Sequence, residues 1–187
     1  MKGILTIGIF IAGMVSSGNL FAQSPSDNGA NKIFSENFDY RDGTLQRTKL
    51  IFQEFDRHGN LISEITLNGD SILISKEENT YDRHHNLIGH AVYDSLGQLV
   101  STTVNTYDNF RDKTQTVVCD AAGKTISSVQ YSYTPFGTKE KEVYKDAGNT
   151  VTKIISYRYD QKGSLTEKII ADGQGNIISR RQYQISY

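Results

Sequence analysis

The segment YDRHHNL at residues 81–87 recurs in altered form as FDRHGNL at residues 55–61 and as YDQKGSL at residues 159–165. The aromatic residue that opens each copy lies on a 26-residue period, which Tyr107 and Tyr133 also occupy. Midway between these positions, a second series with the same period comprises Asp94, Asp120, Asp146 and Asp172. A fixed internal period is typical of a repeat architecture. Each unit is therefore predicted to contain two turns and two strands.

The repeated polar residues have the chemistry of tight turns. At residues 94–97 (DSLG) and 160–163 (DQKG), Asp stands at the first position of a type I turn and Gly at the fourth. The Asp side chain caps such a turn, and Gly tolerates a positive φ. Short segments rich in β-branched and aromatic residues alternate with these turns, which is the signature of a β-meander.

We predict an all-β fold, an antiparallel meander of repeated β-hairpins in 26-residue units that curls into a barrel-like or spiral sheet. Five units counted from residue 55 supply ten strands, and residues 38–54 add one or two more. One column of equivalent positions is apolar and its neighbour is polar, so one face is expected to be buried and the other wet. The apolar column comprises Ile65, Ala91, Val117, Val143 and Ile169, and the polar column Glu64, His90, Thr116, Glu142 and Lys168. The sheet must curl because a flat sheet cannot hide an apolar column.

The N-terminus has the features of a secretory signal peptide. Lys2 precedes an uncharged apolar stretch at residues 3–15, and small and polar residues follow up to Ala22. This stretch is too short for a transmembrane helix, which needs about 20 residues. We predict a signal peptide at 1–22, a flexible lead-in at 23–37 and one β-hairpin repeat domain at 38–187.

The end of the signal peptide, Phe-Ala-Gln at 21–23, resembles signal peptides of the Bacteroidetes group. This resemblance implies a Gram-negative envelope. The expected location is the periplasm, the cell surface or the extracellular medium.

The composition argues against nucleic-acid binding and against an intramolecular disulfide. The chain has 20 basic and 21 acidic residues, a formal net charge of −1, whereas nucleic-acid binding needs clustered Lys and Arg. Nucleic acid is therefore not an expected partner. A single cysteine, Cys119, cannot form an intramolecular disulfide, so packing and strand pairing must hold an exported domain together.

The sequence lacks the usual catalytic motifs. It contains no Gly-x-Ser-x-Gly elbow, no phosphate-cradling Gly-rich loop and no Cys-x-x-Cys pair. We expect a protein that is not an enzyme, has no catalytic residues and binds no cofactor. His58 and His84 occupy equivalent turns, but such turns are two strands apart, about 10 Å, which is too far for one metal ion. No metal site is predicted.

A set of tyrosines is the best candidate for ligand binding. Tyr131 and Tyr133 lie two residues apart on one predicted strand face, as do Tyr157 and Tyr159, and Tyr183 continues the column of Tyr157. We call Tyr131, Tyr133, Tyr157, Tyr159 and Tyr183 the aromatic ridge. Such a ridge could stack against sugar rings or anchor a protein partner. The alternative is structural, because large amphipathic side chains also shield strand ends and pair across strands.

The copies at 55–61, 81–87 and 159–165, together with YTPFG at 133–137, resemble YD repeats of the Rhs/teneurin type. The resemblance covers residues 55–187 and implies a β-sheet shell built from spiralling strands. The chain looks like a small secreted form of the family, similar to uncharacterised Bacteroidetes proteins. Full Rhs shells are far longer and enclose a toxin, whereas five hairpins can enclose little. Descriptions of the family imply carbohydrate as one class of ligand.

The leading functional hypothesis is a non-enzymatic exported YD-repeat protein that acts as a binding or interaction module of the cell envelope or extracellular space. Its partner would be a carbohydrate or a surface protein, and open sheet edges would allow self-association. The alternatives are a small outer-membrane β-barrel, a purely structural repeat protein and a hydrolytic enzyme. We do not expect membrane insertion, because the outward columns carry charges that lipid would penalise.

Overall fold

The structure, a computed structural model, describes residues 31–186. The predicted signal peptide and its cleavage site lie outside these residues. The described part is all-β, and its strands are β1 (Lys32–Arg41), β2 (Thr44–Phe55), β3 (Leu61–Asn68), β4 (Leu73–Tyr81), β5 (Leu87–Tyr93), β6 (Leu99–Tyr107), β7 (Lys113–Asp120), β8 (Thr125–Tyr133), β9 (Lys139–Asp146), β10 (Val151–Tyr159), β11 (Leu165–Asp172) and β12 (Ile177–Gln182).

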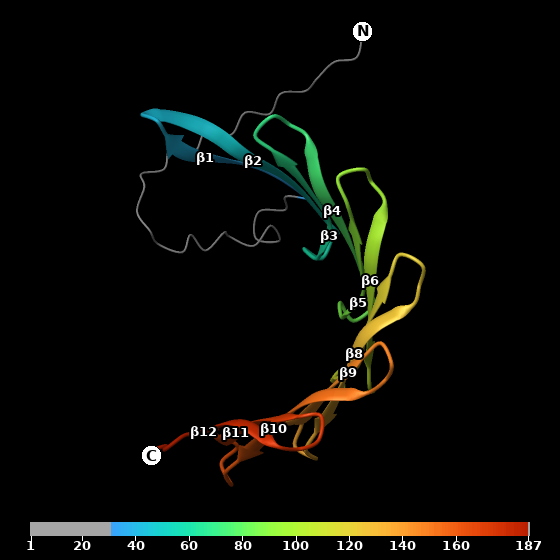
Figure 1. The fold of residues 1–187 in the computed structure, drawn as a ribbon, viewed down its shortest axis with the longest axis vertical. Coiled ribbons are helices and arrows are strands. Elements are labelled where there is room, and N and C mark those ends of the chain that lie inside the picture. Colours follow the sequence, from blue (N-terminus) through green and yellow to red (C-terminus); the bar gives the residue numbers. More distant parts are fainter. Residues whose placement is uncertain (1–30, 187) are drawn as a thin grey trace.

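The twelve strands form one antiparallel sheet in which every strand pairs with its neighbours in the sequence. Figure 1 shows this sheet as an open arc with β1 and β12 at its two ends. The predicted curled meander is confirmed, and the sheet does not close into a barrel. Residues 31–186 include no helix of the length and apolarity needed to cross a bilayer.

The first strand begins earlier than the sequence predicted. β1 starts at Lys32, inside the segment 23–37 that was expected to be a flexible lead-in. It pairs with β2 along its whole length, and the rings of Phe34 and Phe52 meet with their centroids 4.7 Å apart. Cross-strand aromatic contacts of this kind stabilise strand pairs. This contact is a physical reason why the end of the predicted lead-in forms a strand.

The turns have the predicted chemistry. At residues 94–97, the N–H of Gly97 donates to the carbonyl of Asp94 at 3.0 Å, and Gly97 has a φ of 73°. The Asp94 Oδ1 accepts from the N–H groups of Leu96 and Gln98, both at 2.9 Å. The fourth turn position adopts a left-handed φ even where it is not Gly, at Ser71, His85, Arg111 and Asn149.

Four tyrosines fasten the open ends of successive hairpins. The hydroxyls of Tyr81 and Tyr107 donate to the carbonyls of Leu61 and Leu87, both at 2.9 Å. The same bonds recur from Tyr133 to Lys113 at 2.9 Å and from Tyr159 to Lys139 at 2.8 Å. The tyrosines of the 26-residue period therefore have a structural role, because each bonds a backbone carbonyl on the neighbouring strand.

The predicted assignment of the apolar column to the buried face is wrong. Glu142, from the polar column, is only 7% exposed, whereas the apolar column is only half-buried. In residues 31–186, three hydrophobic residues are about as buried as Glu142. They are Leu50, Ile155 and Ala171, which are 5%, 7% and 8% exposed. The reason is that the described sheet is a single layer, whereas an enclosed core needs a second layer.

Two glycines allow the turn geometry to be tested. Gly163 needs its positive φ of 80°, but an added Cβ would meet nothing within 4 Å. At Gly173 an added Cβ would lie against the carbonyl of Val151. We expect Gly163→Ala to lower the free energy of unfolding by about 1–2 kcal/mol through backbone strain alone. Gly173→Ala should cost clearly more, because the backbone of β10 must move. Denaturant unfolding of both variants measures the difference, and equal losses would contradict the clash.

The tyrosine bonds allow a second matched comparison. The carbonyl of Leu87 accepts from Asn105 as well as from Tyr107, whereas Tyr133 is the only side chain in residues 31–186 that donates to the carbonyl of Lys113. We expect Tyr133→Phe to lower the free energy of unfolding by about 1 kcal/mol, and Tyr107→Phe to lower it less. Thermal and denaturant melts of the two variants provide the measurement. A larger loss for Tyr107→Phe would show that these hydroxyls do not act through the carbonyls.

Candidate functional site

The aromatic ridge lies around one buried carboxylate. Tyr131 pairs directly with Glu142 in the ladder between β8 and β9, and Glu142 pairs with Ile155 on β10. Paired residues of an antiparallel ladder point to the same face of the sheet. The hydroxyl of Tyr157 donates to Glu142 Oε1 at 3.1 Å, and the hydroxyl of Tyr144 donates to Oε2 at 2.6 Å. The Glu142 cluster, defined as Glu142, Tyr131, Tyr144, Tyr157 and Lys139, therefore joins three neighbouring strands.

The Glu142 cluster is electrostatically satisfied. Burial alone would raise the pKa of Glu142, but hydrogen bonds from Tyr144 and Lys139, with the Lys139 charge, lower it below its usual value. The Lys139 Nζ lies 3.1 Å from Oε1. Burial and the bond to the carboxylate raise the pKa of Tyr157 to about 12 and raise that of Tyr144 as well. At neutral pH the cluster holds an ionised carboxylate between neutral phenols, an arrangement that stabilises the structure.

Most members of the aromatic ridge have other contacts as well. The hydroxyls of Tyr133 and Tyr159 bond backbone carbonyls. The Lys139 Nζ lies 5.0 Å from the centre of the Tyr131 ring, and the Lys168 Nζ lies 5.5 Å from that of Tyr157. Tyr183, 36% exposed, is the most open member. The structure brings the five tyrosines to one region of the sheet, but the hydroxyls of Tyr133, Tyr157 and Tyr159 already have partners.

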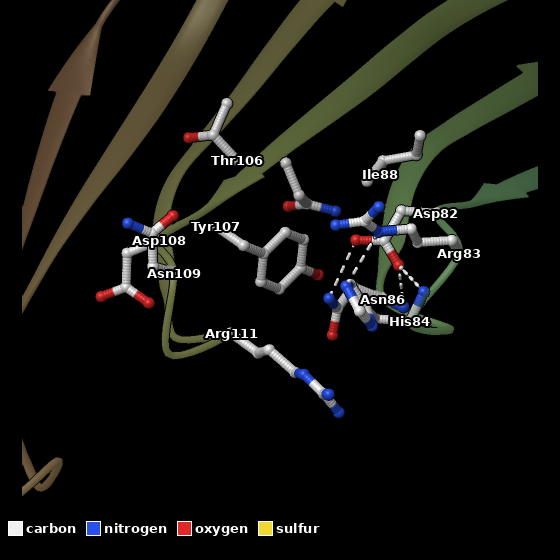
Figure 2. Close-up of a pocket in the computed structure, with 11 residues that line it drawn as sticks. Asp82, Arg83, His84, Asn86, Ile88, Thr106, Tyr107, Asp108, Asn109 and Arg111 are labelled. Carbon is white, nitrogen blue, oxygen red and sulfur yellow. Dashed lines mark hydrogen bonds between the residues drawn. The ribbon is translucent and has the colours of Figure 1, made fainter.

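A different region offers open, polar cavities. A pocket of about 500 Å³, which we call pocket 1, lies between the turn at residues 82–86 and the turn at residues 108–112. In Figure 2 the ring of Tyr107 lies at its centre, and Arg111 extends from its own turn toward the turn that carries His84 and Asn86. Arg83 lies to the right of that ring in this view, beside Asp82. Side chains from two successive turns thus converge on one space.

A second cavity of about 420 Å³, pocket 2, repeats this arrangement one unit earlier. It lies between the turns at 56–60 and 82–86, and Tyr81 takes the place of Tyr107. Arg83 lines both pockets, because its turn separates them. The two pockets are therefore consequences of the repeat, set side by side along one edge of the sheet.

Hydrogen bonds fix the imidazoles in and beside these pockets. The Nε of Arg57 donates to Nε2 of His58 at 2.9 Å, and Arg83 makes the same bond to His84 at 3.1 Å. The rings of His58 and His85 lie 4.3 Å apart between their centres. The imidazoles of neighbouring turns are thus closer than the 10 Å spacing of equivalent positions suggests. Residues 31–186 contain no group of three His, Cys, Asp or Glu side chains that could hold a metal ion.

The carboxylates at the pockets serve the turns. Asp82 Oδ1 accepts from the N–H groups of His84 and Asn86 at 2.8 and 3.0 Å, and Oδ2 accepts from the Asn86 side chain at 2.9 Å. The bond from the Asn86 side chain is the main cause that lowers the pKa of Asp82. An ionised carboxylate bonded in this way can neither donate a proton nor act as a free nucleophile. The pockets place arginine, histidine and asparagine side chains around a tyrosine ring, an arrangement suited to binding polar ligands.

Sequence reasoning missed these pockets. The adjacent Arg and His at positions two and three of two equivalent turns were visible as Arg57-His58 and Arg83-His84. The convergence of Arg111 on the same space depends on the turn geometry, which the sequence pattern does not contain.

The Glu142 cluster predicts a specific dependence of stability on pH. Because the pKa of Glu142 is lowered in the folded protein, its contribution is present above the ordinary value of 4.5 and is lost as pH falls through the folded-state pKa. Glu142→Gln should be less stable at neutral pH, and its deficit relative to wild type should shrink in acid. Denaturant unfolding between about pH 3 and 7 tests this. A constant deficit would mean that the charge of Glu142 adds nothing.

Comparison with known proteins gives limited likeness. No family model and no curated protein matches the chain. Among solved structures, the Tc holotoxin pore of Photorhabdus luminescens is 12% identical over 80% of this chain and 9% of that chain, with a TM-score of 0.36. A porin-like protein from Bacteroides uniformis is 11% identical over 80% of this chain and 83% of that chain, also with a TM-score of 0.36. TcdB2-TccC3 without its hypervariable C-terminal region is 11% identical over 74% of this chain and 10% of that chain, with a TM-score of 0.31. The chain spans about a tenth of either toxin chain.

Proposed function

We propose that this chain is a non-enzymatic, exported β-hairpin repeat protein that acts as a binding module of the cell envelope or extracellular space. Its ligand is a carbohydrate chain that lies along the edge of the sheet at pockets 1 and 2. The observation that carries the proposal is the pair of equivalent polar pockets, each with a tyrosine ring and side chains from two rigid turns.

The pockets have the features of a binding surface held by a rigid scaffold. Each turn is fixed by several backbone bonds, so its side chains start from defined positions and lose little freedom on binding. An aromatic ring beside Asn, Arg and His side chains offers both an apolar surface and hydrogen bonds, which suits the mixed surface of a sugar. The aromatic ridge is the weaker candidate for the ligand because the hydroxyls of Tyr133, Tyr157 and Tyr159 have partners within the sheet.

The non-enzymatic part of the proposal rests on the carboxylates. Hydrolysis of a glycosidic bond uses two carboxyl groups, one of them as a general acid. At the pockets, Asp56 and Asp82 are hydrogen-bonded into their turns, and their pKa values are lowered by bonds from Asn60 and Asn86. Neither group can supply a proton near neutral pH. Binding without turnover is therefore the expected activity.

The experiment begins with the full chain, expressed in a Gram-negative host with its own N-terminus. N-terminal sequencing of the purified protein should show that it starts at Gln23, and the protein should come from the envelope or the medium. It is then screened on a glycan and polysaccharide array. A folded wild-type protein that retains no glycan would contradict the carbohydrate proposal, and retention in the cytoplasm would contradict export.

Two variants locate the binding surface. His84→Ala combined with Asn109→Ala alters exposed turn positions that line pocket 1. Tyr131→Ser combined with Tyr157→Ser removes two tyrosines of the aromatic ridge. We expect the first variant to lose glycan retention with little change in melting temperature. The second should melt earlier, because Glu142 loses a donor, and should still bind glycan below its melting temperature. The reverse pattern would move the site to the aromatic ridge.

A further inference from the structure

The free polar atoms of pockets 1 and 2 are mostly hydrogen-bond donors. A guanidinium group carries five N–H donors. Arg57 and Arg83 each use only the Nε donor, in the bond to the adjacent histidine. Neither arginine, nor Arg111, lies within ion-pair distance of a carboxylate in residues 31–186. The Nη groups of two arginines and the whole guanidinium of the third are thus open to a ligand.

The histidines add donors to the same surface. Because Nε2 of His58 and of His84 accepts a bond from arginine, the proton of each neutral ring lies on Nδ1. His85 shows the converse arrangement: its Nδ1 lies 3.0 Å from the side-chain nitrogen of Asn60, which is a donor, so the proton lies on Nε2. Each of the three imidazole rings therefore has one N–H group that can donate a hydrogen bond to a ligand.

Most of the carboxylate oxygens at the same edge already accept hydrogen bonds. Asp56 Oδ1 accepts from the N–H groups of His58 and Asn60, at 2.8 and 3.0 Å, and Oδ2 accepts from the Asn60 side chain at 2.8 Å. Asp82 makes the same three bonds, and Asp108 Oδ1 accepts from Phe110 and Asp112. The formal charges of the chain nearly cancel. The carboxylates at this edge, however, are bonded within their own turns, whereas the arginine Nη groups are open to a ligand.

From this imbalance we propose that pockets 1 and 2 bind the acidic groups of an anionic polymer, with Arg83 shared between neighbouring groups. Carboxylate, sulfate and phosphate oxygens all provide the acceptors that the pockets lack, and Arg binds such groups through paired N–H donors. The inference rests on the proposed function and names the chemical class of its ligand. Equivalent turns are two strands apart, about 10 Å, so acidic groups at that interval along one chain would occupy both pockets together.

The test measures binding of the full exported chain to four polymers by isothermal titration calorimetry. Polygalacturonate supplies carboxylates, dextran sulfate supplies sulfates, long-chain polyphosphate supplies phosphates, and dextran is neutral. Wild type should bind at least one acidic polymer with a Kd about tenfold or more below that for dextran. The acidic polymer that binds most tightly identifies the natural group. Equal affinity for dextran would overturn the anionic ligand while the carbohydrate proposal stands.

Arg83→Gln is the decisive variant, and Arg181→Gln is its matched control. Arg181 is exposed on β12 and lies outside the residues that line either pocket, so its loss changes the net charge equally. Arg83→Gln should raise the Kd for the acidic polymer about tenfold or more, with an unchanged melting temperature, and Arg181→Gln should change it less than about threefold. Equal effects of the two variants would show attraction by net charge alone and would overturn the site. Failure of wild type to bind any acidic polymer would do the same.

Discussion

Every hairpin from β2 onward depends on one side-chain oxygen that accepts two backbone N–H groups across its turn. Asp94 shows the bond pair, and Asn68 and Thr134 make it with an amide and a hydroxyl oxygen. This oxygen sets the length of the turn, the length sets the strand register, and the register decides which side chains meet across strands. Because the side chain of the first turn residue makes these hydrogen bonds, the side chains at the next two positions are not needed to form the turn. Arginine and histidine can therefore stand at turn tips without disturbing the sheet.

The fold could be predicted from the sequence because its cause is local. The period of Asp and aromatic residues places turns and strands, and the turn at 94–97 has the predicted bonds. Burial could not be predicted in this way. Alternation along a strand says which residues share a face, but only a second layer makes a face dry, and none covers the described sheet. In this single layer, burial depends on neighbouring side chains in the same sheet. Tyrosines cover Glu142, whereas Ile65 and its equivalents stay half-buried.

The candidate site was harder to predict because it joins residues from different units. The aromatic ridge was named from spacing, and spacing alone does not show that Tyr133 and Tyr159 bond carbonyls. The expected separation of about 10 Å holds for equivalent turn positions. His85 is one position beyond the equivalent of His58, and its φ of 65° belongs to a left-handed residue that is not Gly. The two rings, 4.3 Å apart, therefore meet between positions that are not equivalent in the repeat, a contact that the 26-residue spacing does not contain.

Every strand pair in this sheet joins neighbours in the sequence, from β1 with β2 to β11 with β12. Contacts of such short sequence separation give a low contact order, and chains of this kind fold quickly because little loop entropy is lost before each contact forms. The stability is then close to a sum of nearest-neighbour terms, as in linear repeat arrays. Local opening should start at the two ends of the arc and proceed inward, hairpin by hairpin. The strands β8, β9 and β10, which share the carboxylate of Glu142, should open later than the strands at either end.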